Sequence, residues 1–231
     1  MIFLHGGFWR AAFDRSHAGP LASALARGGY AVCVPEYRRT GQPGGGWPGT
    51  FDDVAAAVDA LPGLAAEAAR GLLDPGTVLL AGHSAGGHLA LWAAARNLLP
   101  AGARWYTGGT RVRGVLGLAA VSDLAGCDER NLGRGAARLL MGGGRHRHPD
   151  RYAQADPARL VPAAAPVRLV HGALDDVVPC QLSLDYAAVA GRAGGDVACE
   201  VLPGCGHFEV IDPLSGAWAH VLAALRALST P

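Results

Sequence analysis

VLLAGHSAGG, residues 78–87, joins a short apolar run to the beginning of an Ala/Leu-rich helical pattern. Its centre, residues 82–86, has the G-x-S-x-G spacing of a nucleophile elbow, a sharp turn between a strand and a helix. Because such a turn is tight and strained, the side chains two positions either side of the serine must be small. The N-terminus of the following helix favours negative charge that develops beside the serine. The stretch therefore predicts that Ser84 is a nucleophile at the end of a buried strand, with a glycine-rich turn that does no chemistry as the alternative.

Outside this stretch, short apolar runs alternate with longer amphipathic ones, which indicates a parallel sheet covered by helices. The expected strands are residues 2–5, 30–35, 77–81, 112–119, 167–171 and 197–202. The expected helices are residues 20–27, 51–61, 85–96, 181–193 and 213–228, with a shorter one at 133–141. Strict alternation is missing from the buried strands, as expected when both faces are covered. The sequence predicts one α/β domain over residues 1–231, with a mainly parallel, doubly wound sheet of about six strands and helices on both faces.

Composition excludes several classes of function. Hydrophobic residues make up 50% of the chain and charged residues 17%, which predicts a large core and not a disordered chain. The net charge of +1 gives no field that steers the chain to nucleic acid or an anionic membrane. No apolar run approaches the ~20 residues of a membrane span. The five cysteines are scattered without a C-x-x-C pair, which argues against a disulfide framework and a zinc site. We expect a cytoplasmic protein that binds neither nucleic acid nor membrane.

A pair of glycines follows the first expected strand in HGGFW, residues 5–9. Backbone N–H groups beside such a pair can point at a substrate oxygen, and with the N–H of Ala85 they would form an oxyanion hole. We expect Gly7 and Phe8 to supply these donors. The alternative is a plain Gly-Gly turn, and His5 is interpreted as a brace of the loop.

A general base is expected on a loop at the same edge of the sheet. GCGHF, residues 204–208, follows the last expected strand, which makes His207 the candidate. HGALDDVVP, residues 171–179, follows the strand before it and supplies a carboxylate in the order Ser–Asp–His. Asp175 would hold the imidazole tautomer and stabilise the imidazolium after His207 takes the serine proton. Ligand sites in parallel sheets lie at the carboxyl ends of strands, so Ser84, Asp175 and His207 are predicted to form a catalytic triad.

Two other acids could take the place of Asp175. Asp176 is its neighbour in the chain, and Asp123 follows the fourth expected strand. Of the remaining histidines, His83 is expected to pack beside the elbow and His171 to brace the acid loop.

These motifs resemble those of the α/β-hydrolase superfamily over essentially the whole chain. H-G-G-x-W at 5–9 and G-H-S-A-G-G-H-L at 82–89 are similar to the esterase/arylformamidase branch, with its kynurenine formamidase-like and hormone-sensitive-lipase-like enzymes. G-x-x-D-x-x-V-P at 172–179 and G-H-F at 206–208 match that group's acid and histidine motifs. The resemblance implies a serine hydrolase of the carboxylesterase or amidase type that needs no metal or organic cofactor. Esterases, formamidases and acyl-peptide-type peptidases share the motifs, which therefore leave the substrate undecided.

The sequence departs from this superfamily at its start. Family members carry two strands before the one that leads to H-G-G, and this sequence begins inside that strand. Either the true start lies upstream or the fold is a minimal version without those strands. The remaining strands, counted along this chain, would have the order 2-1-3-4-5-6, which leaves residues 30–35 as an exposed edge. Such an edge makes a homodimer through it possible.

The predicted reaction is attack of Ser84 on a carbonyl, which gives an acyl-enzyme that water hydrolyses. Only residues 123–166 are available for a cap, so we expect a small-molecule substrate with a modest acyl or aryl group. Phe8, Trp9 and Phe208 are expected to wall its pocket. A non-catalytic protein that uses the fold to bind a ligand is the alternative from a different class.

Overall fold

The computed structural model describes residues 1–73, 78–108 and 112–229. Within these ranges, five parallel strands form one sheet in the order β1-β2-β3-β4-β5. The strands are β1 (Ile2–Leu4), β2 (Val78–His83), β3 (Val112–Leu118), β4 (Val167–Gly172) and β5 (Val197–Leu202). Five of the predicted strands are thus confirmed, with ends that differ by two residues at most. Residue 77, the first of one predicted strand, lies outside the described residues.

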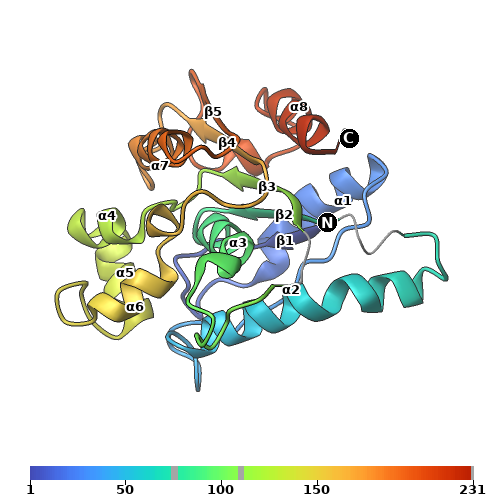
Figure 1. Ribbon diagram of the computed structural model, residues 1–231. Coiled ribbons are helices and arrows are strands. Elements are labelled where there is room, and N and C mark those ends of the chain that lie inside the picture. The colour runs from blue at the N-terminus through green and yellow to red at the C-terminus, as the bar shows by residue number, and fades with distance from the viewer. Residues whose placement is uncertain (74–77, 109–111, 230–231) are drawn as a thin grey trace.

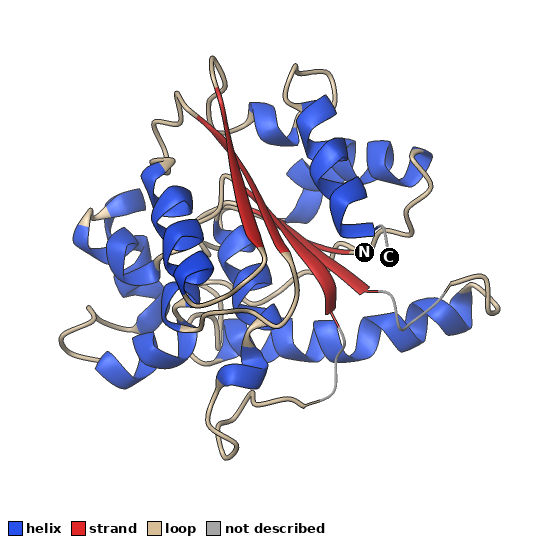
Figure 2. Cartoon of the chain, turned by 45° about the horizontal axis from the view of Figure 1, so that its top comes forward, coloured by secondary structure: helices blue, strands red, loops and turns tan. Residues whose placement is uncertain are grey.

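Helices cover both faces of this twisted sheet (Figure 2). The longer ones are α1 (Gly19–Arg27), α2 (Gly49–Ala68), α3 (Ala85–Ala94), α7 (Gln181–Arg192) and α8 (Trp218–Ser229). α1 and α8 share one hydrophobic cluster with Phe3, whereas α2, α3 and α7 share another with Ile2 and Leu4. Neighbouring residues of β1 therefore point to opposite faces, as the pleat of a strand requires. The predicted doubly wound α/β class is confirmed.

The edge of the sheet beside β1 differs from the prediction. Residues 30–35 run along β1 but pair with it through an isolated parallel bridge between Cys33 and Ile2. The Phe3 N–H donates to the Cys33 carbonyl at 2.8 Å, and the Cys33 N–H donates to the Met1 carbonyl at 2.9 Å. Because β1 has only three residues, it offers a neighbour few backbone groups to pair with. The sheet therefore has five strands instead of about six, with residues 30–35 at the expected edge. A homodimer through this edge stays a prediction.

The winding of the chain brings two loops together. Residues 30–35 lie on one side of β1, and β2 lies on its other side with Leu4 opposite Gly82. The chain thus reverses its direction of winding between β1 and β2, and sites in α/β sheets form where this happens. The loop that follows β1 and the elbow that follows β2 meet at this point.

An insertion of short helices separates β3 from β4. Its elements are α4 (Leu124–Glu129), α5 (Leu132–Met141), α6 (Pro149–Ala155) and the 3-10 turn η3 (Pro157–Arg159). Figure 1 shows the insertion in yellow-green to gold, to one side of the sheet. The helix predicted at 133–141 is α5, although Gly133, Arg134 and Gly135 have left-handed backbone.

Two helix boundaries differ from the prediction by more than two residues. α2 continues from Gly49 to Ala68 with Pro62 inside it, whereas the predicted helix ends at residue 61 because proline removes a helical bond. Its buried first half, which includes Phe51, anchors the helix ahead of the proline. α8 begins at Trp218 and not at residue 213, because turns take up residues 213–217. The short 3-10 helix η4 (Glu209–Ile211) lies before these turns.

Candidate active site

Ser84 stands at the turn between β2 and α3. Its backbone has φ 55° and ψ −119°, a conformation that residues with a Cβ rarely adopt. The Ser84 N–H donates to the Leu118 carbonyl of β3 at 2.9 Å. The Ser84 carbonyl accepts from the N–H groups of His88 and Val121, both at 3.1 Å. Three backbone bonds therefore hold the strained turn between sheet and helix, as a nucleophile elbow requires.

Contact distances explain the small residues of the motif. A Cβ at Gly82 would lie 2.2 Å from the Gly86 carbonyl oxygen, and a Cβ at Gly86 would lie 2.0 Å from the Leu4 carbonyl oxygen. A Cβ at Gly87 would meet the Ala120 side chain at 2.6 Å. The elbow is packed so closely on β1 and on its own helix that a methyl group does not fit.

Gly86→Ala should therefore lower the free energy of unfolding by about 3 kcal/mol, because the new methyl group meets backbone that cannot move aside. The matched control is Gly63→Ala in the exposed part of α2, where a Cβ meets nothing within 4 Å. That change should raise the free energy of unfolding by about 0.5–1 kcal/mol. Urea unfolding of both variants measures the difference. Equal stability of the two would show that the contact at Gly86 is not as close as described.

The loop after β1 lies directly against the elbow. A Cβ at Gly6 would be 3.2 Å from the Cβ of Ser84. Gly7, Phe8 and Trp9 follow with positive φ values of 107°, 49° and 56°. Such strain persists only where the surrounding structure holds it, and it concentrates at functional sites.

Several bonds hold this strained loop at its far end. The Arg10 N–H donates to the Gly7 carbonyl at 3.0 Å, and the Thr40 N–H donates to the Trp9 carbonyl at 2.8 Å. The Arg10 guanidinium also donates to the Gly133 carbonyl, which ties the loop to the insertion. The insertion thus contacts the candidate site through the loop after β1.

His5 braces the same loop from within the core. Its Nδ1–H donates to the Gly6 carbonyl at 2.9 Å, and its ring stacks on Tyr37 at 4.4 Å. The Tyr37 hydroxyl donates to the His5 carbonyl at 2.7 Å. Burial lowers the pKa of His5, which keeps the ring neutral and suits a structural role.

Asp175 and His207 form a hydrogen-bonded pair at the same end of the sheet as Ser84. The Asp175 Oδ2 lies 2.6 Å from His207 Nδ1, and the two side chains are 0% and 4% exposed. Asp175 follows β4 and His207 follows β5, so all three residues stand beyond the carboxyl ends of strands. This distance is the one expected of a carboxylate that orients a general base.

Three further N–H groups bind the same carboxylate. Val177 and Val178 donate to Oδ1 of Asp175 at 2.9 and 2.7 Å, and His171 Nε2 lies 3.1 Å from Oδ2. Burial alone would raise the pKa of Asp175, but the hydrogen bonds from His171, His207 and the backbone outweigh it. They hold the pKa well below its ordinary value. The carboxylate therefore stays ionised, which allows it to stabilise an imidazolium.

The two rival acids lie elsewhere. Asp176 is exposed. Asp123 caps α4, where its Oδ1 accepts the Gly126 N–H at 2.7 Å. In the described chain, the carboxylate bonded to His207 is that of Asp175.

His83 holds the His207 loop, a role that sequence reasoning missed. Its Nε2–H donates to the His207 carbonyl at 3.0 Å, and the two rings lie 4.6 Å apart. Burial, together with the neighbouring His207, lowers the pKa of His83 to about 3, so the ring is neutral. Its place directly before Ser84 is the one signal in the sequence that could have suggested a site role.

A cavity of about 540 Å³ has Ser84 and His207 in its wall. The other residues that line it are Gly7, Phe8, Phe13, His17, Pro20, His83, Val177, Phe208, Ile211, Asp212 and Pro213. Phe8 and Phe208 line this cavity, and their role in holding a substrate stays a prediction. Phe13 and Ile211 were not predicted, because Phe13 lies in a loop and Ile211 in the short helix η4, and neither stretch has a sequence pattern.

Trp9 does not wall this cavity, so its predicted role is wrong. Its side chain is fully buried and packs edge-on against His88 at 5.1 Å between ring centres. The left-handed turn at Phe8 and Trp9 sends the first ring to the cavity and the second to the core.

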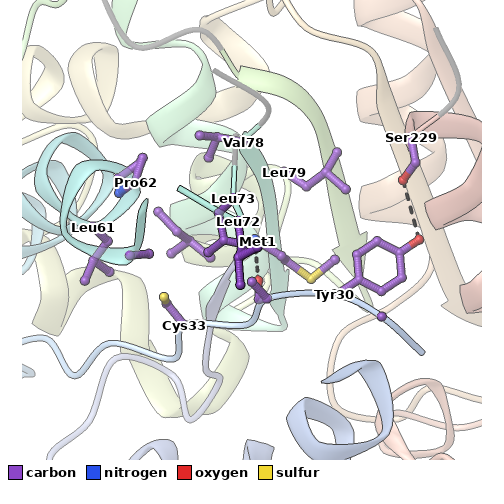
Figure 3. Close-up of a pocket in the computed structure, with 14 residues that line it drawn as sticks. Met1, Tyr30, Cys33, Leu61, Pro62, Leu72, Leu73, Val78, Leu79 and Ser229 are labelled. Atoms are coloured by element: carbon purple, nitrogen blue, oxygen red, sulfur yellow. Dashed lines mark hydrogen bonds between the residues drawn. The ribbon is translucent and has the colours of Figure 1, made fainter. Parts of the chain in front are cut away.

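A second cavity, of about 320 Å³, opens at the amino ends of the strands beside Met1, Tyr30 and Cys33 (Figure 3). The described residues that line it include no histidine and no carboxylate.

Elsewhere in the described ranges, no cluster of three or more His, Cys, Asp or Glu side chains is placed to hold a metal ion. The helices within those ranges are also too short or too polar to cross a bilayer. The cytoplasmic location stays a prediction.

A family model called BD-FAE matches residues 1–189 of the chain. The chain belongs to the BD-FAE family. This is an esterase family of the α/β-hydrolase type, which confirms the superfamily resemblance. Membership of the branch that includes the arylformamidases and the hormone-sensitive-lipase-like enzymes stays a prediction. A search of curated proteins finds no match.

Solved esterase structures share the fold. A truncated carbohydrate esterase from gut microbiota is 22% identical with a TM-score of 0.81, and the match covers 99% of this chain and 85% of that one. Esterase B from Lactobacillus rhamnosis is 22% identical with a TM-score of 0.81, over 99% and 74% of the two chains. Carboxyl esterase 2 from the mycorrhizal fungus Tuber melanosporum is 21% identical with a TM-score of 0.74, over 99% and 77%. At such identities the likeness concerns the fold.

Proposed function

We propose that this BD-FAE family member is a serine esterase that uses Ser84, Asp175 and His207 as its catalytic triad. The observation that carries the proposal is the buried hydrogen bond of Asp175 to His207, together with the cavity wall that His207 shares with the strained elbow at Ser84. Strained backbone, a paired acid and base and a cavity with apolar walls coincide at one place in the fold.

The reaction begins with attack of the Ser84 hydroxyl oxygen on the ester carbonyl carbon while His207 Nε2 takes the hydroxyl proton. Asp175 holds the Nδ1–H of His207 and stabilises the imidazolium. His207 then gives the proton to the leaving alcohol as the carbon–oxygen ester bond breaks. Water, deprotonated by the same imidazole, attacks the acyl-enzyme and releases the acid.

The oxyanion hole is assigned to the N–H groups of Gly7, Phe8 and Ala85. Ala85 is the first residue of α3, so its N–H has no partner within the helix. Gly7 and Phe8 line the cavity with Ser84. Each such donor contributes about 3 kcal/mol to transition-state stabilisation in comparable sites.

The cavity favours an ester with a modest acyl or aryl group. Its volume is about 540 Å³, and Phe8, Phe13, Phe208 and Ile211 give it apolar walls. Phe208 is 61% exposed and Phe13 is 51% exposed, so apolar surface continues to the mouth of the cavity. An amide, a formamide or an acyl-peptide would meet the same triad, and N-formylkynurenine tests the formamide.

The test combines a fluorophosphonate probe with a panel of p-nitrophenyl acyl esters and N-formylkynurenine. The probe should label Ser84, as peptide mass spectrometry would show. The acetyl and butyryl esters should have a kcat/KM about tenfold or more above that of the palmitoyl ester, because the cavity is small. Faster turnover of N-formylkynurenine than of every ester would identify an arylformamidase. An unlabelled serine with no turnover would identify the non-catalytic alternative.

A further inference from the structure

Two histidines share one oxygen of the Asp175 carboxylate. Oδ2 lies 2.6 Å from His207 Nδ1 and 3.1 Å from His171 Nε2. The side chains of His171 and Asp175 are both fully buried, and solvent does not reach the shared oxygen. The proposed mechanism above uses His207 and leaves His171 without a part.

The neighbours of His171 fix where its hydrogen lies. Nε2 is also 2.8 Å from the Val178 carbonyl oxygen, and both this oxygen and the Asp175 carboxylate can only accept. Nε2 must therefore carry the hydrogen and donate it to both. On the other side of the ring, Nδ1 lies 2.8 Å from the Ser183 hydroxyl of α7, which can donate to it. The ring is thus held from both ends as a donor aimed at Asp175.

We propose that His171 is a positioning residue that donates its Nε2–H to Asp175 Oδ2 and so limits how strongly this carboxylate stabilises the His207 imidazolium. The inference rests on the proposed function, because His207 is the general base only if that function holds. Donation to Oδ2 has two effects. It keeps this oxygen directed at His207. It also reduces the negative charge on Oδ2 that is available to stabilise the imidazolium.

The other titratable groups near His207 are not among the described hydrogen-bond partners of the His171 side chain, which are Ser183, Asp175 and Val178. His83 of β2 packs against the His207 ring and stays neutral. Glu209 of η4 accepts the Gly206 N–H at 3.1 Å, and His17 and Asp212 line the cavity. A change of titration in His171 variants therefore reports on the Asp175 contact.

The experiment compares two amides at position 171. The amide nitrogen of glutamine can take the place of Nε2, whereas that of asparagine takes the place of Nδ1 and leaves Asp175 without this donor. His171→Asn should raise the pKa of His207 by about half a unit or more, because the charge of Asp175 is then less shared. The acid limb of the pH profile of kcat/KM should move up equally, with kcat/KM about tenfold lower at the optimum. His171→Gln should bring the midpoint of the acid limb and the value of kcat/KM most of the way back to those of the wild-type protein.

His88→Asn is the matched control for the loss of a buried histidine. His88 is fully buried and bonds a backbone carbonyl, that of Ala155, at 2.9 Å, but it does not touch Asp175. This variant should lower the melting temperature and leave the midpoint of the acid limb in place. A midpoint that moves alike in the asparagine and glutamine variants of His171, or in neither, overturns the proposal.

Nitrogen-15 NMR of the histidine rings provides a readout that needs no turnover. In the wild-type protein, His171 should be protonated at Nε2, and a ring protonated only at Nδ1 would overturn the proposal because it could not donate to Asp175. The same spectra give the pKa of His207 in the variants directly. If the protein cleaves no ester but the pKa of His207 still rises in His171→Asn, the proposed function fails while the coupling of the two histidines holds.

Discussion

Ser84→Ala should lower kcat for p-nitrophenyl acetate by about 10⁶-fold and leave a folded protein. The hydroxyl is the attacking group, and no other described residue that lines the cavity carries a hydroxyl or a thiol to replace it. Alanine has the same Cβ as serine, so the strained φ of 55° is no worse than before. Steady-state hydrolysis, corrected for the uncatalysed rate, measures the loss, and circular dichroism checks the fold. Activity within a few-fold of wild type would contradict the triad.

Two further variants separate chemistry from backbone strain. Ser84→Gly should be as inactive as the alanine variant but more stable than it by about 1 kcal/mol, because glycine adopts this φ and ψ without strain. Ser23→Ala, an exposed serine of α1, should keep both activity and stability. A fluorophosphonate probe should label the Ser23 variant and neither of the Ser84 variants.

The elbow could be predicted because its requirements are local in the chain. A sharp turn after a buried strand leaves no room for a Cβ at Gly82 or Gly86, and this restriction shows directly in the order of residues. The place of the turn also follows from the sequence, since an apolar run precedes Ser84 and a helical pattern follows it. The Asp175–His207 pair was reached through the order of strands, which brings the carboxyl ends of β4 and β5 together.

What could not be predicted depends on where side chains point after irregular turns. Phe8 and Trp9 are neighbours of the same type, yet the positive φ of both sends one ring to the cavity and the other to the core. Phe13 lies in a loop without periodicity, although its side chain fills the space that a Cβ at Gly7 would need. Residues 30–35 have the apolar composition of a strand, but three residues of β1 cannot support a full ladder.

Asp175→Asn should lower kcat by about 10⁴-fold, through the tautomer of His207. The N–H groups of Val177 and Val178 donate to Oδ1, so the carbonyl oxygen of the new amide should take that position. Its NH₂ group then replaces Oδ2 and faces His207 Nδ1. An NH₂ group can only donate, which forces Nδ1 to accept and moves the imidazole hydrogen to Nε2. An Nε2 that already carries hydrogen cannot take the proton of Ser84.

The sharpest control is Asp175→Ala, because this explanation concerns the tautomer and not the lost charge alone. Alanine leaves Nδ1 of His207 without a partner, so a fraction of the rings keeps the productive tautomer, and this variant should retain more activity than the asparagine variant.

Asp176→Asn, on the exposed neighbour, should stay within about twofold of wild type, as expected of a surface change away from the site. Asp123→Asn should keep the cap of α4, because the asparagine side-chain oxygen also accepts the Gly126 N–H, and should leave kcat within about twofold of wild type. If the asparagine and alanine variants of Asp175 are equally active, the orientation imposed by Val177 and Val178 does not control the base. If the Asp123 or Asp176 variant loses as much activity as the Asp175 variant, the acid has been assigned to the wrong residue.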